Sequence, residues 1–181
     1  MPDTRLDYDR LARSYDQRYV EHDYGGIERT LRTVLDGRRR VLEVGCGTGH
    51  WLEVVGGWGL DPSKGADEWY VYDYFAETLE SDRDRYPASR SIRGWLREAG
   101  LQAASTVLAQ RMSRVVEARP YLERGAAAKH VTSQLALLTE EAYVEGMASV
   151  WSDVRRAEAQ GSALTLRADL HIYATSARVP E

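Results

Sequence analysis

Apolar side chains recur at helical spacing in the first part of the chain, and each such stretch predicts a helix. The first helix is expected over residues 5–19, where Tyr15 belongs to an aromatic-rich face. The second is expected over residues 27–35, after Gly25 and Gly26 break the pattern. Its apolar face consists of Ile27, Leu31, Val34 and Leu35. Both predicted helices precede residues 41–44, the first apolar run that can form a buried strand.

Helical spacing returns in the middle of the chain. Residues 91–99 form a short amphipathic pattern that ends at Gly100, a residue suited to the left-handed position after a helix. Residues 115–128 also have a helical pattern, which Pro120 and Gly125 interrupt. The apolar face of the shorter stretch consists of Ile92, Trp95 and Leu96.

The last part of the chain predicts a helix followed by a strand. Thr139 is typical of a helix N-cap, because its hydroxyl can accept a hydrogen bond from a free backbone N–H, and Gly161 ends the same helix. Residues 164–175 then alternate as a half-buried strand does. A further strand is expected over residues 106–112. Strands and helices that alternate in this way indicate a mixed α/β fold.

A glycine-rich turn follows the short apolar run Val41-Leu42-Glu43-Val44. Glycines stand at every second position, at Gly45, Gly47 and Gly49, with Cys46 and Thr48 between them. Glycine lets backbone N–H groups approach a ligand that a side chain would block, and a helix N-terminus after the turn favours such contacts. The pattern therefore predicts a strand, a tight turn and a cofactor site.

The spacing of the glycines distinguishes between the cofactors that use such turns. A P-loop requires Lys followed by Ser or Thr after its last glycine, and neither pair follows Gly49. The dinucleotide fingerprint places its third glycine five residues after the first, and that position is His50. A histidine there would keep the helix away from the strand, which disfavours NAD and FAD.

The segment VLEVGCGTGH resembles motif I of the class I S-adenosylmethionine-dependent methyltransferases. The resemblance implies that the backbone of residues 45–49 lies against the methionine and ribose parts of S-adenosylmethionine, and that Glu43 contacts its amino-acid end. YDRLARSYDQRY resembles the N-terminal cap helix of small-molecule methyltransferases, which implies a cofactor contact for Tyr15. The implied cofactor-binding residues are Glu43, Gly45, Cys46, Gly47, Thr48, Gly49 and Tyr15.

The resemblance covers most of the chain and implies one Rossmann-like methyltransferase domain over residues 1–181. Residues 1–37 would form N-terminal cap helices, and residues 38–62 the cofactor-binding strand and turn. Residues 63–181 would form the substrate side and the C-terminal helix and strand. GLDPSKGADEWYVYDYF, IRGWLREAGL, TSQLALLTEEAYVEG and ADLHIYAT are similar to segments of that group.

The chain is too short between the turn and Asp61 for the complete fold. Only eleven residues separate Gly49 from Asp61, whereas a helix and a second strand would need about 16. One interpretation makes Asp61 the acid that binds the ribose hydroxyls. The interpretation we favour makes residues 54–61 the fifth strand and its exit, with the second to fourth strands absent. An abbreviated sheet exposes edges, so we also expect self-association.

The composition indicates a globular protein without a general attraction to nucleic acid or membrane. The 181 residues are 43% hydrophobic and 29% charged, with a net charge of −4. The single cysteine, Cys46, excludes an intrachain disulfide, and the chain starts without an apolar leader, so a cytoplasmic location is expected. The four histidines are scattered, so no metal site is expected.

Two functions remain open on the sequence alone. The first is an enzyme that transfers a methyl group from S-adenosylmethionine to a small molecule. The second is a non-catalytic or truncated module that binds or self-associates with an incomplete cofactor pocket. No residue stands out as the catalytic base, although Tyr72, Tyr74 and His130 lie in segments that resemble substrate-facing ones. Packing or surface roles are the simpler interpretation for these three residues.

Overall fold

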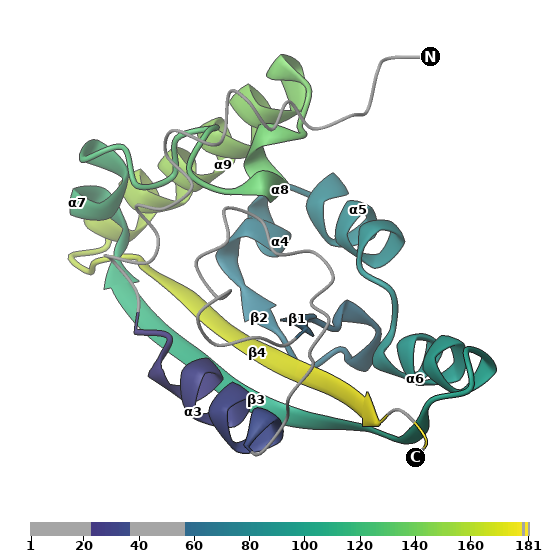
Figure 1. The fold of residues 1–181 in the computed structure, drawn as a ribbon. Coiled ribbons are helices and arrows are strands. Elements are labelled where there is room, and N and C mark those ends of the chain that lie inside the picture. The colour runs from purple at the N-terminus through teal and green to yellow at the C-terminus, as the bar shows by residue number, and fades with distance from the viewer. Residues whose placement is uncertain (1–22, 37–56, 179, 181) are drawn as a thin grey trace. The chain divides into compact units, whose positions relative to one another are not determined.

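The computed structural model describes residues 23–36, 57–178 and 180, and it shows helices together with antiparallel strand pairing (Figure 1). The described chain divides into two compact units. The first unit contains residues 68–84 and 113–169, and the second contains residues 23–36, 57–67, 85–112 and 170–178. A mixed α/β fold is thereby confirmed.

Four strands are described. Strand β4 (Thr165–Arg178) pairs with each of the other three. Its residues 172–175 pair antiparallel with β1 (Gly57–Leu60) in the second unit. Its residues 168–169 pair antiparallel with β2 (Glu68–Trp69) in the first unit. Strand β3 (Gln102–Glu117) also pairs with β4, and each unit contains a part of both strands.

Helix α3 (Gly25–Leu35) supplies two of the three buried residues of an apolar cluster in the second unit. Ile27 and Leu31 are fully buried and form a cluster with Ile172 of β4, as the helical spacing predicted. The half-buried residues that pack against this cluster are Tyr24, Leu60, Ala109 and Met112. The amphipathic face expected over residues 27–35 is therefore confirmed at its two buried positions.

The glycine pair before this face forms the start of the helix, so α3 begins two residues earlier than the expected start at Ile27. The Asp23 carboxylate accepts a hydrogen bond from the Gly25 backbone N–H at 2.7 Å, which satisfies a free donor of the first turn. A Cβ on Gly26 would lie only 3.1 Å from the Ala109 carbonyl oxygen of β3. Glycine is thus needed for the close approach of helix and strand.

The second unit also contains the turn after β1 and, later in the chain, helix α6 (Ser89–Glu98). The turn contains a short 3-10 helix, η1 (Pro62–Lys64), which Gly65 ends with a φ of +61°. Helix α6 ends as expected before Gly100, which has a φ of +80°. The expected apolar face is confirmed only in part, because Trp95 is 56% exposed whereas Ile92 and Leu96 are half-buried.

The first unit is built around helix α9 (Glu140–Ala159). The predicted N-cap is present, since the Thr139 hydroxyl accepts a hydrogen bond from the Ala142 N–H at 3.1 Å. Val150 and Val154 form the buried part of its stripe. The other helices that contribute to this unit are α4 (Tyr70–Tyr74), α5 (Glu77–Arg85), α7 (Ala118–Glu123) and α8 (Ser133–Ala136).

Helix α4 lies close against α9 at one glycine. Phe75, which follows α4, is 2% exposed and stacks on Tyr143 of α9 with the ring centroids 6.0 Å apart. A Cβ on Gly146 would come within 2.5 Å of the Phe75 ring atom Cε1 and closer still to Cδ1. The absence of a side chain at Gly146 therefore makes room for the aromatic ring.

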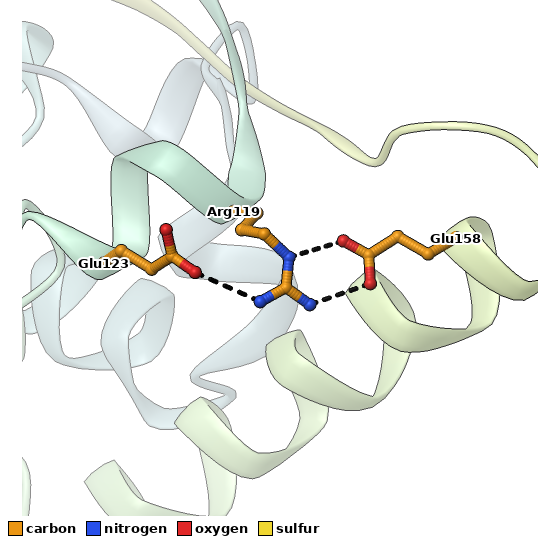
Figure 2. Close-up of polar contacts among 3 residues, drawn as sticks. All are labelled: Arg119, Glu123 and Glu158. Carbon is orange, nitrogen blue, oxygen red and sulfur yellow. Dashed lines mark hydrogen bonds and ion pairs between the residues drawn. The ribbon is translucent and has the colours of Figure 1, made fainter.

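An arginine on α7 links this helix to α9 (Figure 2). The Arg119 guanidinium donates Nε–H to one oxygen of Glu158 at 2.5 Å and Nη2–H to the other at 2.7 Å. It also donates to Glu123 at 3.1 Å and lies 5.4 Å from the Trp151 ring centroid. The two carboxylates raise the pKa of Arg119, and Arg119 lowers the pKa of Glu158. These groups lie on the surface, so the fork fixes orientation more than it adds stability.

Strand β3 is longer than the sequence indicated. The expected strand over residues 106–112 is present, but β3 extends to Glu117, so the helical pattern over residues 115–128 is wrong at its start. Helix α7 occupies only six of those positions. Pro120 lies in its first turn, where a missing backbone N–H costs no helical hydrogen bond.

Candidate functional site

The residues that the resemblance assigns to the cofactor lie outside the described part of the chain. These residues are Tyr15, Glu43, Gly45, Cys46, Gly47, Thr48 and Gly49. The cofactor site therefore stays a prediction from the sequence. A polar cluster in the second unit lies within the described part of the chain, next to the end of β1.

Asp61 stands at the end of β1 and is almost fully buried, at 3% exposure. Ser63 donates its hydroxyl hydrogen to Oδ1 at 2.5 Å, and the Ser89 backbone N–H donates to Oδ2 at 2.9 Å. Burial raises the pKa of the Asp61 carboxyl, but the hydrogen bonds from Ser63 and Ser89 and the charge of Lys64 together lower it below the ordinary value. The carboxylate is thus ionised and holds the start of α6 against the end of β1.

This geometry bears on the two interpretations of Asp61. A ribose ligand presents its carboxylate to two hydroxyl groups of the nucleoside. Both oxygens of Asp61 already accept hydrogen bonds from the protein, and the side chain is buried. The contacts favour the interpretation in which Asp61 belongs to the exit of a strand.

A histidine and a buried aspartate come together next to the same strand end. Asp67 precedes β2 in the chain, and its side chain is 5% exposed. Its Oδ1 accepts the backbone N–H of His171 at 2.7 Å and lies 3.3 Å from Nδ1 of the same residue. His171 lies on β4 directly before Ile172, the residue that pairs with the last residue of β1. Asp67 therefore accepts a hydrogen bond from the backbone N–H of the first β4 residue outside the pairing with β1.

Tyr173 and Lys64 complete this cluster. Tyr173 lies two residues after His171 on β4, so both side chains are on the same face of the strand. The ammonium group of Lys64 lies 4.6 Å from the centroid of the Tyr173 ring. Burial raises the pKa of the Tyr173 phenol, and the charges of Asp67 and Asp61 raise it further. The phenol is consequently neutral near pH 7 and can act as a hydrogen-bond donor.

The aromatic block of residues 69–75 has structural partners in the first unit. Tyr72 donates to Oδ2 of Asp82 at 2.8 Å, and Gln134 donates to the same oxygen at 2.8 Å. Tyr74 donates to Asp153 at 2.9 Å. Burial and the Asp153 carboxylate raise the pKa of Tyr74 to about 12, so its hydroxyl is a poor proton acceptor at neutral pH. Neither tyrosine has the surroundings of a general base.

Tyr70, on the same helix α4, also has a raised pKa. Burial and the neighbouring Tyr121 raise the pKa of Tyr70, and the two rings meet edge to face with centroids 5.9 Å apart. His130 is an exposed residue in the turn region after α7. Packing and surface roles, which were the simpler interpretation for Tyr72, Tyr74 and His130, fit their observed environments.

The pairing of Asp67 with His171 was not found from the sequence. The two residues are 104 positions apart, and His171 looks like one polar position in an alternating strand. Pairing between β1 and β4 brings them together, and no local pattern specifies that pairing. The segment ADLHIYAT predicts the closing strand, but nothing in its pattern distinguishes the histidine from the other polar positions.

Within residues 23–36 and 57–178, no group of three His, Cys, Asp or Glu side chains is arranged to hold a metal ion. Over the same part of the chain, every helix is too short or too polar to cross a bilayer. No protein-family model, curated protein or solved structure matches the chain.

Proposed function

We propose that this protein is an S-adenosylmethionine-dependent methyltransferase with a Rossmann-like fold that acts on a small molecule. The observation that carries the proposal is the run Glu43-Val44-Gly45-Cys46-Gly47-Thr48-Gly49, with an acid at the strand end and glycines at every second position after it. This spacing departs from the P-loop and from the dinucleotide fingerprint, so it points to one type of cofactor.

The residues of this run have distinct roles in the proposal. The backbone of Gly45, Gly47 and Gly49 lies against the cofactor, and Glu43 binds its amino-acid end. Tyr15 covers it from the N-terminal helix. S-adenosylmethionine, when bound, supplies a methyl group on a positively charged sulfur. The protein then has mainly to align the acceptor with that methyl group and to remove one proton.

The hydrogen bonds of Asp61 support the abbreviated version of the fold. In the proposal β1 is the fifth strand of the domain and Asp61 is its exit, and the support for this is that both Asp61 oxygens accept hydrogen bonds within the protein. In this version the ribose is held without an acid from a second strand. The proposal therefore predicts weaker cofactor binding than a complete domain would give.

A second candidate function is a non-catalytic module that self-associates. It is favoured by large apolar side chains exposed in the second unit, namely Trp95 at 56%, Val107 at 46% and Leu108 at 52%. Light scattering at increasing protein concentration tests this candidate. A growing average mass supports it, and a monomer mass at high concentration contradicts it.

Calorimetric titration with S-adenosylmethionine tests the enzyme proposal. The wild type is expected to bind with a Kd in the micromolar range, and Gly47→Val is expected to abolish the heat because its side chain fills the space for the cofactor. Gly94→Val is the matched control, since nothing lies within 4 Å of a Cβ at this helical position. Equal binding by all three proteins would show that the glycine turn is not the site.

A further inference from the structure

Two arginine side chains of the first unit contact the same aromatic ring. The guanidinium carbon of Arg114, on β3, lies 5.8 Å from the centroid of the Tyr121 ring, and that of Arg124 lies 5.1 Å from it. Arg124 directly follows α7 and stands three residues after Tyr121, a spacing that brings two side chains to one side of a helical turn. Arg114 is close to the same ring because β3 leads directly into α7 (Figure 1). We call these three residues the Tyr121 cluster.

The positive charges of this cluster are not neutralised by the protein. Within the part of the chain that the structure describes, neither of the two guanidinium groups forms an ion pair or a hydrogen bond. Arg119 on the same helix is different, since Glu158 and Glu123 both accept its N–H groups. A contact between a guanidinium group and an aromatic ring uses the positive charge and none of the N–H donors. Both side chains are exposed, so their donors can reach a ligand from solvent.

The hydroxyl group of Tyr121 supplies a third donor. The buried Tyr70 donates its hydroxyl hydrogen to the Tyr121 oxygen at 3.5 Å. Burial and the neighbouring Tyr121 raise the pKa of Tyr70, so Tyr70 keeps the proton that it donates. Tyr121 acts as the acceptor in this contact, and its own hydrogen therefore points elsewhere. No acceptor for that hydrogen is found among the described residues.

We propose that Arg114, Tyr121 and Arg124 bind the phosphate group of a small phosphate monoester. This inference goes beyond the proposed function and does not depend on it, because it uses neither the methyl donor nor the glycine turn. A guanidinium group can donate two parallel N–H bonds to oxygens of one phosphate group, and the tyrosine hydroxyl can donate to another oxygen.

The charge of the cluster determines the class of anion that it suits. A phosphate monoester carries a charge of about −1.5 to −2 near pH 7, which matches two guanidinium groups. A monocarboxylate would neutralise only one of them. The chain as a whole has a net charge of −4, so general electrostatic attraction does not bring anions to its surface. Binding must therefore come from the local arrangement of donors.

The exposure of the cluster limits the affinity that it can give. Charges at the surface are weakened by water and by salt, so we expect a Kd for the phosphate group alone in the millimolar range. The remainder of the monoester can make further contacts, so the monoester should bind at least as tightly as inorganic phosphate.

NMR spectroscopy of the full chain tests the proposal directly. The Nε–H signals of the arginine side chains are recorded at constant ionic strength while inorganic phosphate, glycerol phosphate or acetate is added. The signals of Arg114 and Arg124, assigned with the variants Arg114→Gln and Arg124→Gln, should shift saturably with both phosphates. Acetate should bind at least tenfold more weakly, because it carries one negative charge.

The variants distinguish the cluster from general charge effects. Arg114→Gln and Arg124→Gln should each raise the Kd for glycerol phosphate about tenfold, since each removes a charged donor. Arg97→Gln is the matched control, because it removes the same charge from an exposed position of α6 in the second unit and should leave the Kd within twofold. Tyr121→Phe keeps the ring and removes only the hydroxyl, so it should raise the Kd by a smaller factor of about three. Circular dichroism checks that each variant is folded.

Three results would overturn the proposal. The first is the absence of a saturable shift of the Arg114 and Arg124 signals at tens of millimolar phosphate. The second is acetate binding as tight as phosphate binding, or inorganic phosphate binding that is tighter than glycerol phosphate binding. The third is an equal loss of affinity in Arg97→Gln and in the two cluster variants. Titration with S-adenosylmethionine is a separate experiment, so failure of this proposal and failure of the proposed function can be told apart.

Discussion

Replacement of Gly146 by alanine should destabilise the protein, although the same change in most helices does the opposite. An exposed glycine in a helix interior costs about 1 kcal/mol relative to alanine, so the helical propensity alone favours the substitution. At Gly146 the new Cβ would lie 2.5 Å from Cε1 and 3.0 Å from Cγ of Phe75. Ordinary contacts between carbon atoms are about 3.5–4.0 Å long, so the ring must move by about 1 Å.

The ring has little freedom to make that movement. Phe75 is 2% exposed and stacks on Tyr143, which belongs to the same helix as Gly146. Overpacking of a core costs about 1–3 kcal/mol, and an overlap as close as this one belongs in the upper part of that range, above the gain in propensity. The difference between the two terms is a net loss, and we therefore expect Gly146→Ala to lower the free energy of unfolding by up to about 2 kcal/mol.

Urea denaturation followed by circular dichroism measures the effect. Gly94→Ala is the matched control, because it lies inside helix α6 with nothing within 4 Å of the added Cβ, and it should raise stability by about 0.5–1 kcal/mol. Phe75→Leu should relieve the overlap. The double variant Gly146→Ala/Phe75→Leu should therefore lose less stability than the sum of the losses of the two single variants. If Gly146→Ala stabilises the protein as much as Gly94→Ala does, the close packing of α4 on α9 is refuted.

Two further predictions concern stability. Asp61→Asn should cost about 1–2 kcal/mol at pH 7, because the charge-assisted hydrogen bonds from Ser63 and Ser89 become neutral. Since the folded pKa of Asp61 is depressed, its contribution is complete above about pH 4 and is lost as the pH falls through the folded pKa, so urea titrations of the two proteins should converge in acid. A difference that stays constant down to pH 2 would contradict the ionised state. Thr139→Ala should lower the free energy of unfolding by about 1 kcal/mol, because the N-cap hydrogen bond is lost. Thr139→Ser keeps the hydroxyl and should retain most of the wild-type stability. If thermal unfolding shows equal losses for the two variants, the hydroxyl is unimportant.

Local signals in the sequence predicted helices α3, α6 and α9 and the last strand. The hydroxyl of Thr139 and the left-handed glycine Gly161 mark both ends of α9, because capping depends on a few neighbouring residues. The alternation over residues 164–175 identified β4, since one face of the strand is buried. Spacing also identified Ile27 and Leu31 as the buried face of α3.

Features that depend on distant contacts could not be predicted. Gly26 looks like a helix breaker until the carbonyl of Ala109 is seen against it. The helical pattern after Val115 gave way to a strand because β3 pairs with β4, and this pairing outweighs local preference. The contact between Asp67 and His171 belongs to the same class, since only the fold connects residues 104 positions apart.

The most direct test of the central claim is the affinity of the wild-type protein for S-adenosylmethionine, compared with NAD in the same calorimetric titration. The glycine spacing after Glu43 predicts saturable binding of S-adenosylmethionine with a Kd in the micromolar range and no heat with NAD. Absence of binding at millimolar S-adenosylmethionine, or tighter binding of NAD, would contradict the claim.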